Sequence, residues 1–296
     1  MKIAFTYTNL LGLGRSLLAL GTLLTLLVNS NSVLFDLNIL SQPGTILQNA
    51  GIFFLMNQHL MVAKLICMAV LLLVISGWYP KLTGILHWYV SYSFFTSCNI
   101  VDGGDHITAV MTFLLIPITL TDPRKNHWYG IHTSVESLKA TIARAFFILI
   151  QIQVCAIYFH AFVGKIGVED WLNGTAAYYW LTHEFFGIHQ ALNPLFTKIL
   201  ANPFAVTLVT WGTMVLEFLL ASCILLDKYS NRRYIMLAAG LLFHFSILAI
   251  HGLFTFFFAI TACLLLYLLP DTTVLSKELF TTWKSKFKNI GRAAHI

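Results

Sequence analysis

The chain has 296 residues, of which 58% are hydrophobic and only 10% are charged, and its formal net charge is +6. Soluble domains carry about 25% charged residues, so this composition excludes an ordinary soluble protein and predicts a polytopic protein of the lipid bilayer. In such a chain a positive charge bears on topology and lipid contact. The basic residues do not cluster with aromatic ones as a nucleic-acid groove requires, and we therefore expect no nucleic-acid partner.

Eight apolar windows have roughly the length of about 20 residues that crosses a bilayer. In chain order they cover residues 10–28, 60–78, 84–97, 107–120, 141–163, 204–226, 234–250 and 253–269. The window at 107–120 is short, which predicts a helix that is tilted, inserted partway or extended at its ends. We therefore predict an all-α integral membrane bundle of about eight transmembrane helices. Its transmembrane domain covers residues 1–270, and a basic tail covers residues 271–296.

The basic residues fall mainly on one side of this eight-helix topology. The other side receives only Lys64, Lys165 and Lys198. Because cytoplasmic loops are enriched in Lys and Arg, this bias predicts that both termini are cytoplasmic. It also places residues 98–106 and Lys165 on the outer face. The predicted inner side carries Lys2, Lys81, Arg124, Lys125, Lys139, Lys228, Arg232, Arg233, Lys277, Lys284, Lys286, Lys288 and Arg292, with Arg15 and Arg144 at helix ends, where snorkelling explains them.

The cysteines indicate no metal site. None of them makes a CxxC pair or shows metal-ligand spacing, and most lie inside apolar runs, where cysteine is an ordinary small hydrophobe. Cys98 is the exception, because it follows a predicted helix beside polar residues, and it is the one candidate for a redox role. The cysteines are Cys67, Cys98, Cys155, Cys223 and Cys263.

The stretch YFHAFVGKIGVEDWLNG, residues 158–174, lies where a long apolar run stops, and it carries Lys165. A lysine in this position is commonly an interface anchor, with its stem in lipid and its ammonium in water. It can instead be a partly buried base, because lysine loses its proton more readily when it is desolvated. The sequence leaves both interpretations open.

A second polar segment, SCNIVDGGDHI, connects the third and fourth predicted spans on the outer face. It contains Asp102, Asp105 and His106 around a pair of glycines. One interpretation is a solvated turn in which Asp105 caps the following helix. The other is a hydrogen-bonded pair of Asp105 and His106 at the mouth of the bundle, which would tune an acid or a base.

Two further polar residues lie in the middle of predicted spans, Glu217 in the sixth and His244 in the seventh. A carboxylate at bilayer depth is costly, so it is normally neutral, paired or at a cavity. We expect Glu217 and His244 to satisfy each other, and to join Asp102, Asp105, His106 and Lys165 around an outward-facing cavity.

The chain resembles a known family through two of these segments. The pairing of NIVDGGDHITAVMTFLLIPITLTD with YFHAFVGKIGVEDWLNG resembles the transmembrane domain, often called the HTTM domain, of vitamin K-dependent gamma-carboxylases and their bacterial relatives. The opening RSLLALGTLLTLLVN and the DGGD turn are more similar still to the sporulation-delaying protein B family. That family consists of bacterial membrane proteins needed to produce a secreted peptide toxin. The resemblance therefore implies a multi-pass protein of the bacterial cell membrane.

The resemblance also implies roles for particular residues. His106 matches the functional histidine of the carboxylases, and Lys165 matches the second lysine of a pair, taken there as the base that deprotonates vitamin K hydroquinone. Asp170-Trp171 matches an acidic-Trp element. The lysine pair itself is reduced here to Gly164-Lys165.

Two functions are then the main hypotheses. The first is a membrane component that matures a peptide toxin precursor on the outer face, together with a partner maturation protein. The second is a carboxylase-like or epoxidase-like enzyme that uses a reduced quinone as its cofactor. In the second, Lys165 is the base, His106 orients or stabilises an oxyanion, and Asp105 completes the catalytic set. A scaffold or transporter is a weaker third hypothesis, because no pair of broken, repeated helices is visible.

Overall fold

The computed structural model describes residues 4–42, 44–129, 133–136, 138–184, 187–188 and 192–275. The described chain is predominantly helical, which confirms the predicted all-α class. The basic residues at 277–292 and Lys2 lie outside the described residues. Of the predicted tail, residues 271–275 are described, and they pack against the start of the first helix, where Asn9 and Leu275 exchange two hydrogen bonds.

Each of the eight apolar windows falls on one long helix. Six of the described helices are long and apolar enough to cross a membrane. They are α1 (Asn9–Val28), α6 (Leu60–Ser76), α8 (Gly103–Thr121), α9 (Leu138–Ile166), α13 (Pro203–Ser222) and α14 (Asn231–His251). The other two windows form α7 (Pro80–Ser97) and the 15-residue α15 (Phe254–Leu268).

Several helices are longer than their apolar windows, and two of them, α8 and α9, include polar residues that hydropathy excludes. Helix α8 has 19 residues because it begins at Gly103, directly after the capping residue Asp102, and so includes the polar turn that hydropathy excludes. Helix α9 has 29 residues and includes Lys165 in its last turn. Apolar windows therefore locate the helices, whereas their first and last turns can include polar residues outside the windows.

Short elements fill the connections. The segment between α1 and α6 contains α2 (Asn31–Leu34), α3 (Leu37–Leu40), α4 (Ile46–Asn49), α5 (Ile52–Leu55) and η1 (Asn57–His59). The segment between α9 and α13 contains α10 (Glu169–Leu172), α11 (Ala176–Leu181) and α12 (Asn193–Leu200), and η3 (Cys223–Leu225) follows α13. One two-stranded antiparallel sheet, β1 (Ala4–Tyr7) with β2 (Thr133–Glu136), pairs Ala4 with Glu136 and Tyr7 with Thr133.

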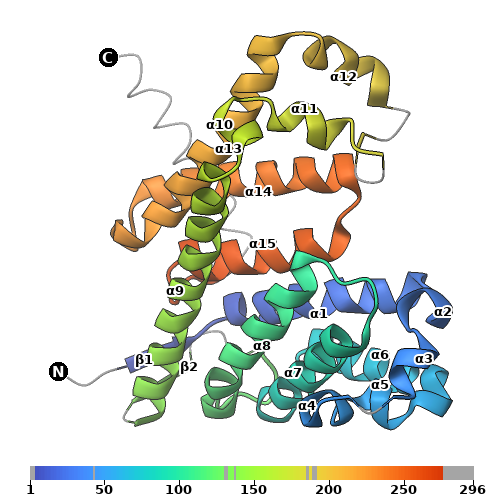
Figure 1. Cartoon of the computed structure of the whole chain (residues 1–296). Helices are drawn as coiled ribbons and strands as arrows, with labels where there is room; N and C mark the ends of the chain where they lie inside the picture. The colour runs from blue at the N-terminus through green and yellow to red at the C-terminus, as the bar shows by residue number, and fades with distance from the viewer. Residues whose placement is uncertain are drawn as a thin grey trace.

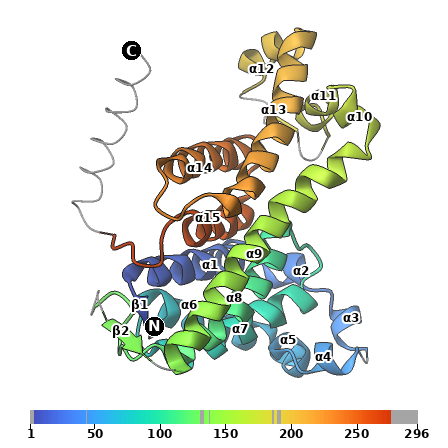
Figure 2. The ribbon, with the colours of Figure 1, turned by 90° about the vertical axis from the view of Figure 1, so that its left-hand side faces the viewer.

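The helices pack around α15. This helix contacts α1, α8, α9 and α14, and most of its side chains are buried. Figure 1 shows α1, α15 and α14 lying side by side, and Figures 1 and 2 both show α9 running obliquely past them. Because α15 is surrounded by protein, its 15 residues do not need to match the bilayer along their whole length.

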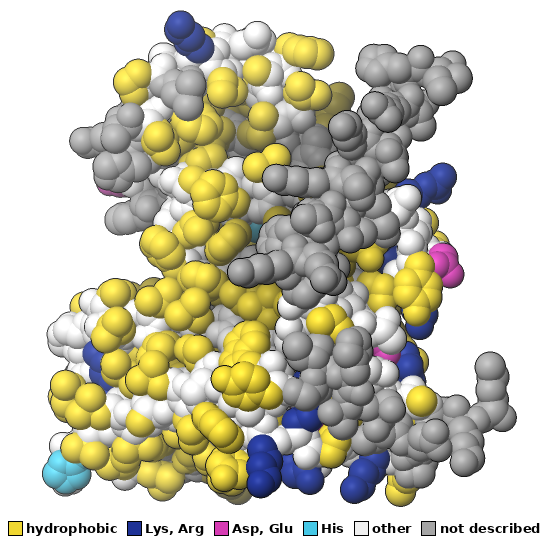
Figure 3. Space-filling view, turned by 180° about the vertical axis from the view of Figure 1, so that it is seen from behind, with side chains coloured by type: hydrophobic (Ala, Val, Ile, Leu, Met, Phe, Trp, Pro, Cys, Tyr) yellow, Lys and Arg dark blue, Asp and Glu magenta, His cyan; other side chains and the backbone are white. Residues whose placement is uncertain are grey.

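The surface of the bundle is suited to lipid. Figure 3 shows hydrophobic side chains over much of one face, with Lys and Arg side chains mainly towards its margins. Soluble monomers rarely expose apolar patches of such extent. Helix α6 illustrates the pattern, because successive turns expose Met61, Val62, Leu65, Ile66, Leu72 and Leu73.

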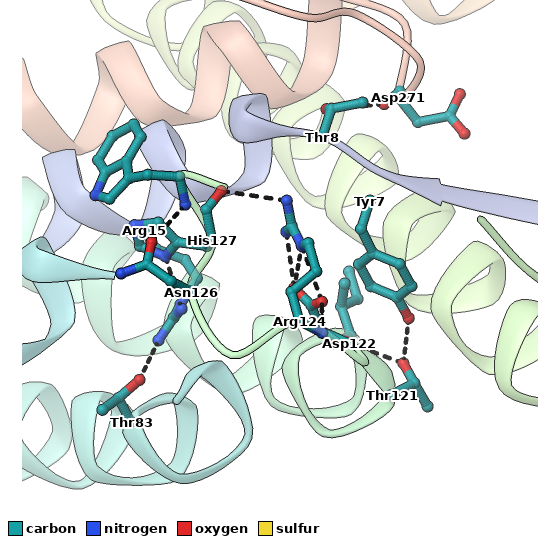
Figure 4. A network of polar contacts seen from close by, with 12 residues as sticks. Tyr7, Thr8, Arg15, Thr83, Thr121, Asp122, Arg124, Asn126, His127 and Asp271 are labelled. Atoms are coloured by element: carbon teal, nitrogen blue, oxygen red, sulfur yellow. Dashed lines mark hydrogen bonds and ion pairs between the residues drawn. The ribbon is translucent and has the colours of Figure 1, made fainter. Parts of the chain in front are cut away.

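The end of the bundle near β1 contains a buried polar network (Figure 4). Arg15 is only 2% exposed, so our expectation that it snorkels to the interface is wrong. Its guanidinium bonds Thr83 Oγ1 at 2.9 Å and His127 Nδ1 at 3.0 Å. Since arginine has no acceptor, Nδ1 must be the unprotonated nitrogen of the His127 ring. Nearby, Arg124 forms an ion pair with Asp122 at 2.7 Å.

Asp271 joins three further elements at this end. Its backbone oxygen accepts a hydrogen bond from Thr8, and its carboxylate lies 3.0 Å from Arg144 and 3.9 Å from Lys228. The start of α1, the start of α9 and the turn before α14 therefore share one end of the bundle, as an alternating helix topology requires.

Candidate functional site

Lys165 lies in the last turn of α9, at the opposite end of this helix from the network of Figure 4. Its Nζ donates to the carbonyl oxygen of Ala161 at 3.1 Å and to Glu217 Oε1 at 2.8 Å. It also lies 4.9 Å from the centre of the Trp171 ring. A cation at a helix C-terminus is favourable because unpaired carbonyls and the helix dipole are negative there. Lys165 is therefore held by a carboxylate, a carbonyl and an aromatic face.

Glu217 and His244 do not satisfy each other, so that expectation is wrong. Glu217 on α13 pairs with Lys165, and its side chain is 9% exposed. His244 on α14 contacts α9 instead, with Nε2 2.9 Å from the hydroxyl of Tyr158. The reason is the position of α9, which packs on α13 and so brings Lys165 to Glu217. One buried oxygen, Glu217 Oε2, has no hydrogen-bond partner among the residues that the structure describes.

The ion pair lies on the wall of a cavity of about 330 Å³. This Lys165 cavity is lined by side chains from α9, α10, α11, α13, α14 and α15, and most of them are apolar or aromatic. A few polar groups at the edge of an apolar hollow are typical of ligand-binding sites. The lining includes Lys165, Trp171, Trp180, Thr210, Glu217 and Phe256.

The turn after α9 fixes the aromatic side of this cavity. Trp211 on α13 donates its indole N–H to the carbonyl oxygens of Trp171 and Leu172. Gly174 follows with a φ of 75°, and a Cβ there would lie 2.7 Å from Thr207 Cγ2. Only glycine adopts this backbone without strain. The GVEDWLNG sequence thus folds back onto α13 and places the Trp171 ring over Lys165.

Asp105 lies in a different cavity. Asp102 and Asp105 form a reciprocal capping box at the start of α8, in which Asp102 Oδ1 accepts from two backbone N–H groups and Asp105 Oδ2 accepts from the Asp102 N–H. Both residues line a cavity of about 420 Å³ between α1, α2 and the α14–α15 turn, here called the Asp105 cavity. The turn caps α8, but the prediction that Asp105 is the N-cap residue is wrong, because α8 begins at Gly103 with Asp102 as its N-cap and Asp105 in its first turn.

His106 is exposed and lies in neither of these cavities. Its ring stacks on Phe95 of α7 at 5.1 Å with an angle of 11° between the planes. It borders a small hollow of about 90 Å³ between α8 and α9. The three predicted catalytic residues Lys165, Asp105 and His106 therefore lie at three separate cavities rather than around one. A catalytic role for any of them stays a prediction.

The pairing of Lys165 with Glu217 was not foreseen. The sequence singles out Lys165 and Glu217 separately, but it does not pair them, although an unmatched cation and an unmatched carboxylate in one apolar chain are a signal for pairing.

At Cys98, burial raises the pKa of the thiol to about 11. A protonated thiol is a poor nucleophile, and this speaks against a redox role.

The chain is similar to two curated proteins of Bacillus subtilis strain 168. The uncharacterized protein YitO is 38% identical over 90% of this chain and 88% of its own length. The sporulation-delaying protein SdpB is 33% identical over 96% of this chain and 91% of its own length. The chain belongs to the sporulation-delaying protein B family. No family model matches it, and no solved structure matches it.

Proposed function

We propose that this member of the sporulation-delaying protein B family is a multi-pass protein of the bacterial cell membrane that takes part in producing a secreted peptide toxin. It acts on the toxin precursor at the outer face, together with a partner maturation protein. The observation that carries this proposal is the Lys165–Glu217 pair on the wall of the apolar Lys165 cavity. The similarity to SdpB over nearly the full length of both chains supports the same family role.

The Lys165 cavity is suited to an apolar peptide segment. Trp171, Trp180 and Phe256 offer aromatic surface, while the Lys165–Glu217 ion pair offers hydrogen bonds at one side. Aromatic residues bury large areas with few rotatable bonds, which favours binding of apolar side chains. We infer that the precursor contacts this wall.

The second hypothesis, an HTTM-like enzyme that uses a reduced quinone, has one supporting observation. A flat apolar ring fits the aromatic lining, and Lys165 is the nearest amine. However, Nζ donates to Ala161 and Glu217, whereas a base must accept a proton. The quinone-dependent function therefore requires Lys165 to leave Glu217 before it can accept a proton. Toxin production without quinone chemistry needs no such step.

The test is toxin output from cells that carry Lys165 variants at matched membrane abundance. Antibacterial activity of the culture medium is measured against a sensitive indicator strain, in a host lacking the chromosomal copy. Lys165→Met removes the ion pair and is expected to abolish output. Lys165→Arg keeps the charge and a donor to Glu217 but cannot act as a base.

An active Lys165→Arg protein is expected under the first hypothesis and excludes the second. Loss of output in both variants favours the second, and the purified protein is then examined for a bound quinone. Lys198→Met is the matched control, because Lys198 is exposed on α12 and lies outside the Lys165 cavity. Full output from Lys165→Met would remove the Lys165 cavity from the proposed function.

A further inference from the structure

The Asp105 cavity is lined by two acidic residues, Asp102 and Asp105, and neither of them lines the Lys165 cavity. The turn at Gly252 and Leu253, between α14 and α15, separates the two. We propose that the Asp105 cavity binds the ammonium group of a lysine side chain of the peptide precursor. This inference rests on the proposed function, because it takes the ligand to be that peptide.

The first observation is a buried carboxylate oxygen for which the described part of the chain supplies no donor. Asp105 is 4% exposed, and its Oδ2 accepts from the Asp102 N–H, whereas its Oδ1 has no hydrogen-bond partner among the described residues. A buried carboxylate oxygen without a partner is costly, because it has given up its hydrogen bonds to water. A donor that enters the cavity removes that cost.

The second observation is the charge of the lining. Asp102 and Asp105 both border the cavity, and within the described ranges no Lys, Arg or His forms an ion pair with either of them. The nearby Lys64 donates to the carbonyl oxygen of Asn29 at 2.6 Å and is not part of the lining. A positively charged ligand would therefore find two acidic groups that no described Lys, Arg or His pairs with.

The remaining lining decides which cation fits. The described residues contain no group of three or more His, Cys, Asp or Glu that could hold a metal ion. Apolar side chains cover most of the wall, and they suit the four-carbon stem of a lysine. Those from α1, α2 and the start of α15 are Leu24, Val28, Val33, Leu34 and Phe254. The amide of Asn29 adds one polar group beside the carboxylates.

Binding of two capped, fluorescently labelled hexapeptides to the full chain in detergent tests this inference. Both have leucine and valine at five positions, and the sixth is lysine in one and norleucine in the other. Hydrogen bonds to charged groups are stronger than those between neutral groups, so the lysine peptide should bind about tenfold tighter or more. Equal affinities for the two peptides would overturn the proposal.

The variant Asp105→Asn tests whether the preference for the lysine peptide depends on Asp105. Asparagine keeps one oxygen for the Asp102 N–H but places an NH₂ donor where Oδ1 was, so the preference for lysine should disappear. Asp36→Asn is the matched control, because Asp36 is also a helix-capping carboxylate but borders another cavity. If Asp105→Asn does not fold, Asp102→Asn takes its place, since asparagine is an equally good N-cap and the change removes one of the two acidic groups, so the preference for lysine should weaken. A preference that persists in Asp105→Asn, or that is unchanged in Asp102→Asn, would also overturn the proposal, whereas Asp36→Asn should keep it.

A lipid is the other source of an ammonium group. The titration is therefore repeated in nanodiscs of phosphatidylglycerol, with and without phosphatidylethanolamine. A lysine preference in both supports the peptide as ligand, whereas its loss only with phosphatidylethanolamine assigns the cavity to lipid and overturns the peptide assignment. These outcomes do not depend on toxin output, so failure here is distinguishable from failure of the Lys165 experiment.

Discussion

Lys165 Nζ lies 2.8 Å from Glu217 Oε1, and this ion pair joins the end of α9 to the middle of α13. Both side chains are largely buried, at 19% and 9% exposed. Charges withdrawn from water in this way are stable only together, because each solvates the other. The pair is therefore a structural link between two helices as well as the polar feature of the Lys165 cavity.

Removing one partner of this pair should cost more than removing both. Lys165→Met leaves the Glu217 carboxylate unpaired, and we expect a loss of about 3 kcal/mol in the free energy of unfolding. The double variant Lys165→Met/Glu217→Gln should recover part of that loss, because no charge remains unpaired. Unfolding by SDS in mixed micelles measures all four proteins of the cycle.

The exposed Lys198→Met should change the unfolding free energy by no more than about 0.5 kcal/mol and serves as the control. Strictly additive losses in the cycle would mean that the two charges do not stabilise each other.

The glycine pair of the DGGD turn offers a second test. A Cβ on Gly104 would fall on the backbone of α15, 2.5 Å from Phe256 Cα, whereas a Cβ on Gly103 would meet only the Phe256 ring at 3.5 Å. Backbone cannot move aside as a side chain does, so Gly104→Ala should lower the unfolding free energy by about 2 kcal/mol or more. Gly103→Ala should cost less than about 1 kcal/mol.

The two alanine variants differ by one position and are compared by thermal unfolding in detergent. Equal melting temperatures would show that α8 and α15 do not approach as closely as described.

Much of the fold could be predicted from the sequence, because hydropathy alone locates helices in a lipid-exposed chain. Strand β1 was missed because its four residues carry no strong pattern and their partners in β2 lie more than 120 residues further along the chain. The burial of Arg15 was missed for a similar reason. Its position near a helix end indicates snorkelling, and only the fold brings Thr83 and the loop at His127 beside it as the acceptors that keep it inside.

The candidate site was predicted in parts. Lys165 and the capping role of the Asp102–Asp105 turn follow from local sequence, because a lysine after an apolar run and an aspartate before a helix have local physical meanings. The Lys165–Glu217 and Tyr158–His244 pairs depend on which helices touch, and this is set by the packing of α9. For the same reason, sequence could not separate the cavities of Asp105 and His106.

The buried His127 should make the fold sensitive to acid. Burial and the neighbouring Arg15 and Arg124 lower its pKa from 6.5 to about 3. Between these values the unfolded chain binds a proton that the folded chain excludes, so this contribution is fully present above pH 6.5 and is lost as the pH falls towards 3. Melting temperatures over this range should fall with acid, and the fall should be smaller in His127→Gln. An unchanged slope in that variant would contradict the prediction.

The orientation of the bundle is the remaining prediction, and the structure sharpens its test. Lys228, Arg144 and Asp271 meet at one end together with β1, so the loops near residues 126 and 230 must share a side. The basic bias predicts that this side is cytoplasmic. Alkaline phosphatase, which is active only outside, should therefore be inactive when fused after Asn126, Ser230 or Ile296, and active after Asn173 or Ala201. The reverse pattern would show that the protein has the opposite orientation in the membrane. Both the Lys165 and the Asp105 cavity would then lie on the cytoplasmic side, away from any secreted peptide.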